Sequence, residues 1–249
     1  TEKGDCILPT GLYVKIGQVL AARPDIVPRQ YVELYTTLLD ALPQLPYSKI
    51  LGIVEESLRS ELGLQWNKVF ESMEETALGS ASIGQCHKAI LKPQWSAYEG
   101  YDGGEVVAVK VIDPDAESRF RNDFDVFRWL CRLALPEWAP LLREMQRQLM
   151  TEFDYRREAA NLSQVRDNML NSKYAKFISI PQPHQGLCTE HLLVMEMLNG
   201  TKLSDAIEDK LAAAIRSDRQ TAKDFIQQRR LGRWGVSRTD HENVQFRNV

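Results

Sequence analysis

The sequence of 249 residues contains little cysteine, no long apolar run and no excess of one charge. Its four cysteines lie far apart and form no C-x-x-C pair, which argues against a zinc ribbon or a redox pair. We therefore expect reduced and mostly buried thiols. The longest useful apolar stretch, 192–198, is interrupted by Glu196 and falls well short of the roughly 18 residues that span a membrane.

The charge balance also limits the classes of function. With 31 basic and 34 acidic side chains the net charge is −3, which argues against a general nucleic-acid binder. A hydrophobic content of 43% and a charged content of 26% are typical of a globular chain, and the length allows one or two domains. The chain opens at Thr1 without a signal-peptide pattern, so the sequence alone indicates no compartment.

Apolar residues at helical spacing predict three helices in the N-terminal part of the chain. The first covers about 12–20, the second about 28–39, and the third follows an N-cap at Ser48 and ends near Gly63. Further helices are expected at 118–134, at about 139–169 and within 203–226, with strands at 82–89, 105–112, 177–180 and 191–197. After residue 232 no period remains, which indicates a loosely ordered tail.

The strongest chemical signal is a lysine at the end of an apolar strand, in the run V-A-V-K that ends at Lys110. A lysine that projects from a buried strand is costly unless it is paired or faces an anion. The preceding loop, 78–85, is built of small residues that would let backbone N–H groups approach a phosphate. It lacks the G-x-G-x-x-G spacing, however, and each feature alone also fits a solvated lysine and an ordinary turn.

Two polar clusters lie on predicted helices. Three carboxylates, Glu152, Asp154 and Glu158, fall within one turn and a half, with Asp154 and Glu158 on one helical face. They could hold a lysine or a metal, or form a solvated face balanced by neighbouring arginines. Near the N-terminus, Lys15 and Gln18 share a helical face in the run K-I-G-Q, which in isolation is a polar edge of an amphipathic helix.

Taken together, these segments resemble the UbiB-type, aarF-domain-containing (ADCK) atypical kinase family. The resemblance is carried by five motifs in order: K-x-G-Q at 15–18, the small-residue loop ending over 80–85, V-A-V-K ending at Lys110, E-x-D at 152–154, and a hinge-like strand at 194–200. It implies an α+β fold, namely a protein-kinase-like small lobe with an antiparallel sheet and an αC-type helix. We expect the helical K-x-G-Q extension at 1–75, the small lobe at 76–200, the start of an incomplete helical large lobe at 201–230, and an atypical tail at 231–249.

The resemblance also implies roles for individual residues. Lys110 would contact the nucleotide phosphates and pair with Glu158, while the K-x-G-Q helix would fold over the nucleotide site and meet the E-x-D carboxylates. The residues with implied catalytic roles are Lys110, Glu158, Lys15, Gln18, Glu152 and Asp154. The residues with implied cofactor-binding roles are Gly79, Ser80, Ala81, Ser82, Gln85, Ala108, Lys110, Met195, Glu196 and Leu198, with Met195 as gatekeeper and Glu196 and Leu198 in the hinge.

The family uses ATP and Mg²⁺, and here the sequence departs from the pattern. The family's magnesium ligands come from an H-x-D-x-H-x-G-N loop and a D-F-G-like aspartate, and neither motif occurs in this sequence. Asp224 and Phe225 are followed by Ile226 inside a helical stretch. No metal site is therefore predicted, and we expect the kinase-like domain to be cut before its catalytic loop.

We therefore expect a chain that binds ATP but does not transfer phosphate alone, with the family's role in isoprenoid-quinone or lipid metabolism. The alternatives are a pseudokinase-like module that binds nucleotide or lipid without catalysis, and a truncated or misjoined gene product. Expected partners are nucleotide and lipid or quinone-pathway proteins, with no nucleic acid and no transmembrane segment. By resemblance the compartment is a mitochondrion or a plastid, with a peripheral position at a membrane as one option.

Overall fold

The computed structural model describes residues 12–23, 25, 27–36, 44–80, 83–96 and 104–233. The chain divides into two compact units, Thr1–Val19 with Tyr35–Leu198 and Leu20–Leu34 with Asn199–Val249. Helices α1 (Leu12–Ala21) and α2 (Arg29–Thr36) both cross this division. The first unit holds the sheet and the predicted small lobe, and the second holds α8 (Leu203–Ile215) and α9 (Arg219–Arg233).

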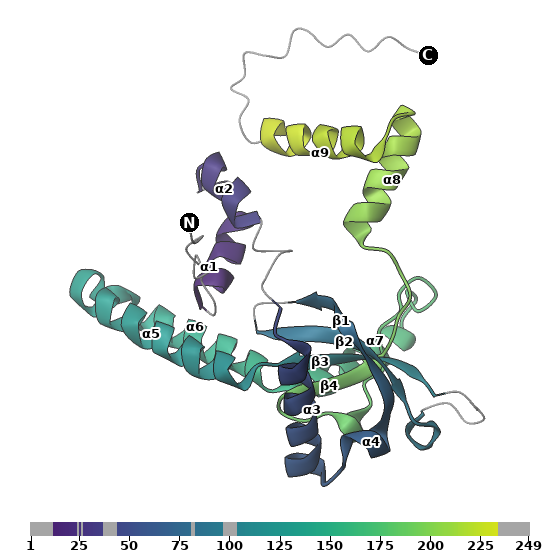
Figure 1. Cartoon of the computed structure of the whole chain (residues 1–249). Helices are drawn as coiled ribbons and strands as arrows, with labels where there is room; N and C mark the ends of the chain where they lie inside the picture. Colours follow the sequence, from purple (N-terminus) through teal and green to yellow (C-terminus); the bar gives the residue numbers. More distant parts are fainter. Residues whose placement is uncertain are drawn as a thin grey trace, which may run out of the picture. The chain divides into compact units, whose positions relative to one another are not determined.

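The first unit is built on one antiparallel sheet with the strand order β1-β2-β3-β4 (Figure 1). Its strands are β1 (Phe70–Ser80), β2 (Gly84–Leu91), β3 (Val106–Ile112) and β4 (Leu192–Glu196). Its remaining helices are α3 (Tyr47–Leu62), α4 (Trp66–Val69), α5 (Pro114–Ala134), α6 (Ala139–Met150) and α7 (Tyr155–Leu170). The expected α+β fold with an antiparallel sheet is thus confirmed.

Side-chain alternation along β3 separates two apolar cores, because successive residues of a strand point to opposite faces of the sheet. Val107, Val109 and Val111 enter a core that also contains Ile50, Val54 and Leu58 of α3. Ile112 enters the other core, which contains residues of α1, α5 and α7 together with Leu193 of β4. Since Lys110 has the same parity as Ile112, its side chain leaves the sheet on the face of the second core.

The second core fixes the turn between α6 and α7. Phe153 is buried, and its ring lies 5.4 Å from that of Phe120 in an edge-on arrangement. Phe120 in turn lies 5.6 Å from Phe124, one turn further along α5. The N-terminal residue of α1, Leu12, is buried in the same core, and its backbone N–H donates to Asp123 of α5 at 3.3 Å. The aromatic residues of α5 therefore position both α1 and the E-x-D segment.

Several of the sequence predictions are confirmed and others are wrong. The helix α3 ends at Gly63, which adopts φ +66° in the left-handed region, as expected of a C-cap glycine. It begins at Tyr47 after Pro46, however, so Ser48 is not the N-cap. The strand β1 was not predicted, because five of its exposed positions between 71 and 76 are polar and only Phe70 and Met73 are buried. β1 also begins before residue 76, the expected start of the small lobe.

Two further expectations are corrected by the structure. The helix predicted over about 139–169 is interrupted by a short 3₁₀ turn, Thr151–Phe153, and by the extended residue Asp154 (φ −126°, ψ 99°). The strand predicted at 177–180 does not form, since Arg166 of α7 holds the carbonyl oxygen of Ile180 at 2.5 Å instead. The helical region 203–226 is confirmed, but it is divided where Arg216 adopts the left-handed conformation.

Gly84, at the start of β2, is a site of close approach. A Cβ atom there would lie 2.6 Å from the carbonyl oxygen of Val111 and 2.7 Å from the hydroxyl oxygen of Tyr155. Overpacking of this kind costs about 1–3 kcal/mol, so we expect Gly84→Ala to lower the free energy of unfolding by that amount in urea denaturation. The control is Gly79→Ala in β1, where a Cβ would meet nothing within 4 Å. Equal stabilities of the two variants would contradict the expectation.

Asp113 joins α3 to the start of α5. Its buried carboxylate lies 3.0 Å from Lys49 and 2.7 Å from Arg119, and it accepts the N-cap hydrogen bond from the backbone N–H of Asp115. Burial raises the pKa of Asp113, but the hydrogen bonds from Arg119 and Lys49 outweigh burial and hold this pKa below its ordinary value. The folded state therefore favours the ionised form.

This carboxylate should make stability depend on pH in the acid range. Because its folded pKa lies below the unfolded value of about 4, its contribution is fully present above that pH and is lost as the pH falls through the folded pKa. We expect Asp113→Asn to cost roughly 1–3 kcal/mol near neutral pH and to have a smaller effect in acid. Urea denaturation at both pH values measures this, and a loss that is independent of pH would contradict it.

Candidate active site

The centre of the candidate site is an ion pair between β3 and α7. The Nζ atom of Lys110 lies 2.7 Å from Oε1 and 2.9 Å from Oε2 of Glu158. Lys110 pairs with Cys86 of β2 and Leu193 of β4, so the lysine lies in a central strand and not at an edge. The two side chains remain 27% and 39% exposed, which leaves the lysine cation open to an anion from solution.

Tyr155, which the sequence analysis did not identify, packs against this lysine. The Nζ atom of Lys110 lies 4.6 Å from the centroid of the Tyr155 ring, a cation–π contact. The phenol is fully buried, and its hydroxyl has no hydrogen-bond partner among the described residues. Burial, followed by the negative charge of Glu158, raises the pKa of Tyr155, so the phenol stays neutral. No sequence signal distinguishes this residue from an ordinary helix tyrosine.

Burial changes the acidity of two cysteines of the first unit, Cys86 and Cys188. Burial raises the pKa of the Cys86 thiol, and the nearby charge of Lys110 only partly opposes this effect. Burial likewise raises the pKa of Cys188 to about 11. Among the three cysteines that the structure describes, Cys131 and Cys188 are buried and Cys86 is partly exposed, which agrees with the expectation of mostly buried thiols.

The K-x-G-Q and E-x-D motifs meet through one of their predicted contacts. The Nζ atom of Lys15 on α1 lies 2.6 Å from Oε2 of Glu152. Gln18 lies one turn further along the same helix and is half-buried. Because α1 is anchored by Leu12 in the second core, the ion pair connects two segments that already pack together.

Asp154 has a different partner from Glu152. It is the N-cap of α7, and its carboxylate accepts hydrogen bonds from the backbone N–H of Arg156 at 3.0 Å and from its Nε at 2.9 Å. The hydrogen bond from Arg156 lowers the pKa of Asp154. Arg156 also reaches Glu61 and Glu190 at 3.4 and 3.5 Å. Asp154 therefore does not share a helical face with Glu158, because it precedes the helix that carries Glu158.

The predicted loop residues lie on both faces of the sheet. Gly79 pairs with Cys86 and Ser80 pairs with Gln85 at the end of the β1–β2 hairpin. Ala81 and Ser82 lie outside the described residues. The side chain of Gln85 is buried opposite the face of Lys110, since Gln85 pairs with Val111.

The amide of Gln85 is already used within the protein. Its Oε1 accepts from the backbone N–H of Leu45 at 2.9 Å, and its Nε2 lies 2.9 Å from Nε2 of His87. The other ring nitrogen of His87 lies 2.8 Å from the carbonyl oxygen of Glu74. Since a carbonyl oxygen only accepts, this contact is a hydrogen bond when the ring nitrogen carries a proton. Gln85 thus fastens the segment before α3 to the sheet.

The predicted hinge residues lie at the end of β4. Ala108 pairs directly with Met195, so a small side chain faces the predicted gatekeeper across the strands. The backbone N–H of Glu196 donates to the carbonyl oxygen of Gln182 at 2.8 Å. Leu198 follows the strand and is partly exposed.

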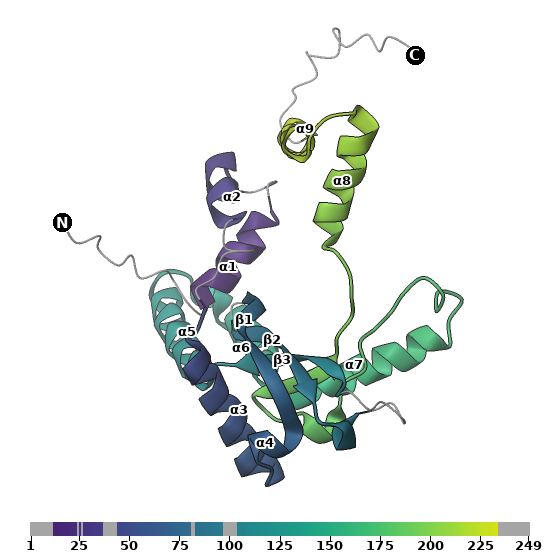
Figure 2. The same ribbon diagram turned by 45° about the vertical axis from the view of Figure 1, so that its right-hand side comes forward.

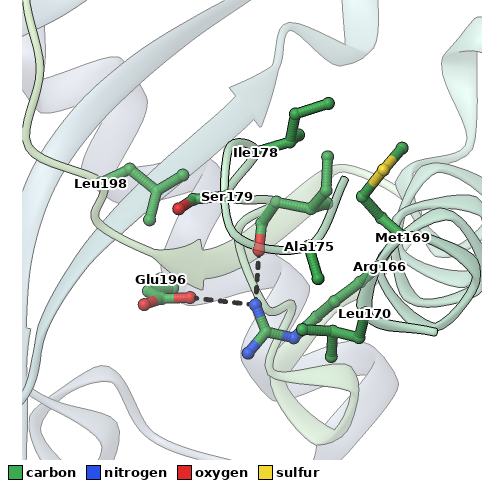
Figure 3. Close-up of a pocket in the computed structure, with 9 residues that line it drawn as sticks. Arg166, Met169, Leu170, Ala175, Ile178, Ser179, Glu196 and Leu198 are labelled. Atoms are coloured by element: carbon green, nitrogen blue, oxygen red, sulfur yellow. Dashed lines mark hydrogen bonds and ion pairs between the residues drawn. The ribbon is translucent and has the colours of Figure 1, made fainter. Parts of the chain in front are cut away.

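A cavity of about 230 Å³ lies beside this hinge (Figure 3). Arg166 of α7 donates to the carbonyl oxygen of Ile180 and lies 3.5 Å from Oε2 of Glu196. The residues that line the cavity are Arg166, Met169, Leu170, Ala175, Ile178, Ser179, Ile180, Glu196 and Leu198. The arrangement links the last turns of the helix that carries Glu158 to the predicted hinge.

The described residues do not fit a magnesium site. No group of three or more histidine, cysteine, aspartate or glutamate residues that could hold a metal ion occurs among them. The carboxylates nearest the candidate site are engaged with cations, Glu158 with Lys110 and Glu152 with Lys15. None of the described helices is long and apolar enough to cross a membrane.

An antiparallel sheet whose third strand presents a lysine to a glutamate on a packed helix is the arrangement of a protein-kinase-like small lobe. Comparison with known proteins then identifies the family. The profile of the ABC1 atypical kinase-like domain matches residues 37–232, more than half of the chain. The chain belongs to this family, which confirms the resemblance stated from the motifs.

Individual relatives agree with this assignment. The chain is 32% identical over 202 residues to the probable protein kinase UbiB of Aeromonas salmonicida, covering 78% of this chain and 34% of that protein. It is 31% identical over 212 residues to the Arabidopsis thaliana protein ACTIVITY OF BC1 COMPLEX KINASE 1, chloroplastic, covering 79% and 28%. The chain thus spans about a third of the length of these relatives. Among solved structures, the complex of Rv3197 with erythromycin from Mycobacterium tuberculosis matches at a TM-score of 0.50 and 27% identity, covering 80% of this chain and 47% of that chain.

Proposed function

We propose that the first unit binds ATP, with Lys110 as the residue that contacts its phosphates. The observation that carries this proposal is the ion pair of Lys110 with Glu158, which holds a partly exposed cation at a fixed place on the sheet. In kinase folds this pair must be formed for the lysine to reach the phosphates. Tyr155 supports the proposal, since its buried ring restricts where the lysine cation can lie.

We assign the adenine to the hinge side of the same face. Ala108 leaves room beside Met195 because its side chain is a single methyl group. Glu196 and Leu198 would offer backbone groups to the base, and Gly79 to Ser82 would approach the phosphates. In this proposal Gln85 does not contact the nucleotide. Its side chain accepts a hydrogen bond from the backbone N–H of Leu45 and so fixes that segment against the β1–β2 hairpin.

The α1 helix is assigned the role of a lid. Lys15 and Glu152 already form an ion pair, and Gln18 is the further polar residue of the motif on α1. A lid of this kind would keep a protein substrate away from the nucleotide. Residues 201–230 are assigned to the start of a large lobe, and α8 and α9 are the helices that it would contribute.

We further propose that this chain binds nucleotide without transferring phosphate, since the described residues hold no metal-binding cluster. The test combines calorimetric titration with ATP and an assay of Mg·ATP hydrolysis by the purified chain. The expected result is saturable binding at one site and no turnover above the level of buffer. Turnover that disappears in Lys110→Met would overturn the second half of the proposal, and the absence of binding would overturn the first.

The pathway and the compartment that we propose rest on membership of the family alone. The Aeromonas relative is named a probable protein kinase, and the name of the Arabidopsis protein includes the words kinase and chloroplastic. We assign this chain to isoprenoid-quinone or lipid metabolism in a mitochondrion or plastid. Fractionation of cells that express the tagged protein tests the compartment, and recovery in the cytosolic fraction alone would contradict it.

A further inference from the structure

Tyr155 makes contacts to three neighbouring strands at one end of the sheet. Its backbone N–H donates to the carbonyl oxygen of Glu190, in the segment that enters β4, at 3.0 Å. The centroid of its ring lies 4.6 Å from the Nζ atom of Lys110 on β3. Its hydroxyl oxygen lies 2.7 Å from the position that a Cβ atom on Gly84, at the start of β2, would take. One residue therefore reaches from the entry of β4 to the start of β2.

The first turn of α7 supplies two of the contacts of Lys110. This helix begins at the sheet beside β4 (Figure 2). Tyr155 and Glu158 are three residues apart, so they lie on one face of the helix. Glu158 gives the lysine an ion pair at 2.7 Å, and Tyr155 gives it the face of a ring. The N-cap Asp154 and the hydrogen bond to Glu190 hold this turn in place, so both groups keep their positions relative to the sheet.

The hydroxyl end of Tyr155 accounts for the glycine at position 84. Among the described glycines only Gly63 has a positive φ, so Gly84 is not required by the conformation of its backbone. It is required by space, because a Cβ atom there would collide with the Tyr155 hydroxyl and with the carbonyl oxygen of Val111. The small residue at this position thus lets a side chain of α7 approach β2 from within the protein.

We propose that Tyr155 is a positioning residue that holds Lys110 and the start of β2 at a fixed separation. The β1–β2 hairpin carries Gly79 and Ser80, which we assign to the phosphates, and β2 begins at Gly84 a few residues later. A phosphate has to meet the lysine and this hairpin together, so a fixed separation lowers the cost of binding. The proposal rests on the proposed ATP site. Since its side chain is fully buried, Tyr155 acts through these neighbours and does not touch the phosphate.

Calorimetric titration with ATP tests the role of the ring. Tyr155→Leu should weaken binding about fivefold, the effect expected from the loss of a partly desolvated cation–π contact. Tyr155→Phe keeps the ring and should restore most of the affinity. The matched control is Tyr174→Leu, which removes a ring that lies 5.1 Å from Nζ of Lys173, outside the site. This control should bind ATP as the wild-type protein does. Equal affinities of the two leucine variants would overturn the proposal.

A measurement without nucleotide separates failure of this proposal from failure of the proposed function. In protein labelled with ¹³C-lysine, the ε-methylene protons of Lys110 should resonate upfield, because the adjoining Nζ atom lies 4.6 Å from the ring centroid. Absence of the signal from Lys110→Met assigns it. The upfield shift should persist in Tyr155→Phe and disappear in Tyr155→Leu. An unshifted signal in the wild-type protein would overturn the proposal even if ATP binds. A shifted signal without ATP binding would overturn the proposed function and not the position of Tyr155.

The contact with Gly84 is tested by a double-mutant cycle in thermal unfolding. Gly84→Ala places a Cβ atom against the hydroxyl oxygen that Tyr155→Phe removes. The melting temperature should therefore fall about 2–4 °C less when Gly84→Ala is made in Tyr155→Phe than in the wild-type protein. The rescue is partial, because the carbonyl oxygen of Val111 remains. Gly79→Ala, where a Cβ atom meets nothing within 4 Å, should show no coupling to Tyr155→Phe. Additive effects of Gly84→Ala and Tyr155→Phe would overturn the proposal, and this result does not depend on whether Tyr155→Leu folds.

Discussion

Replacing Lys110 with methionine is expected to weaken ATP binding at least tenfold without unfolding the protein. A hydrogen bond to a charged group contributes about 1.5–3 kcal/mol, and about 1.4 kcal/mol corresponds to a factor of ten in affinity. Methionine keeps the apolar length of the side chain, so the contact with the Tyr155 ring is retained while the cation is lost. Calorimetric titration with ATP measures the change.

The stability of this variant should change little. Glu158 is more than a third exposed, so solvent can hydrate its carboxylate when its partner is removed. The control is Lys68→Met, which removes an exposed lysine of α4 whose side chain has no role in the proposed site. Equal ATP affinities of Lys110→Met and Lys68→Met would reject Lys110 as the phosphate-contacting residue. A large loss of stability in Lys110→Met would instead assign the lysine a structural role.

Truncating Phe120 to alanine is expected to lower the free energy of unfolding by about 3–5 kcal/mol. Phe120 is fully buried and contacts the rings of both Phe124 and Phe153. The variant leaves a cavity between α5 and the turn that carries Glu152, and the surrounding backbone can close it only in part. Urea denaturation followed by circular dichroism measures the loss.

Phe177→Ala supplies the matched comparison for this variant. The same atoms are removed from a residue that is largely exposed, and a change of less than about 0.5 kcal/mol is expected. A similar loss in both variants would mean that the second core does not depend on Phe120. The free energy of unfolding of a domain is about 5–15 kcal/mol, so the loss expected for Phe120→Ala is a large part of it. The unfolded fraction should therefore rise, and proteases should cleave α5 faster in this variant.

The pairing of Lys110 with Glu158 could be predicted because the order of the motifs resembles that of a known family. Without that resemblance nothing in the sequence connects two residues that lie 48 positions apart. Physical reasoning on the strand alone favoured a solvated lysine. The contribution of Tyr155 was not predictable, since it depends on the direction in which α7 leaves the sheet. The burial of Gln85 was not predicted, because it depends on the register that places Gln85 opposite Val111.

The E-x-D segment shows why helix prediction failed locally. Apolar residues continue at helical spacing through this region, so the pattern predicts one helix over about 139–169. In the structure Asp154 instead caps a new helix, α7, by accepting a hydrogen bond from the backbone N–H of Arg156. Phe153, directly before it, is buried in the core. Periodicity reports which side of a segment is apolar, and a single capping side chain can still end the helix.

Because the helix is interrupted at Asp154, the two carboxylates of the E-x-D motif, Glu152 and Asp154, contact different parts of the protein. Glu152 belongs to the contact with α1, whereas Asp154 belongs to the start of α7, and the buried ring of Phe153 is fixed between them. A molecule that takes Lys15 away from Glu152 would therefore remove one contact of α1, which Leu12 still anchors in the second core, while the cap of α7 and the position of Glu158 stay unchanged. The Lys15–Glu152 contact and the Lys110–Glu158 pair are thus connected along the chain, yet either can be broken without the other.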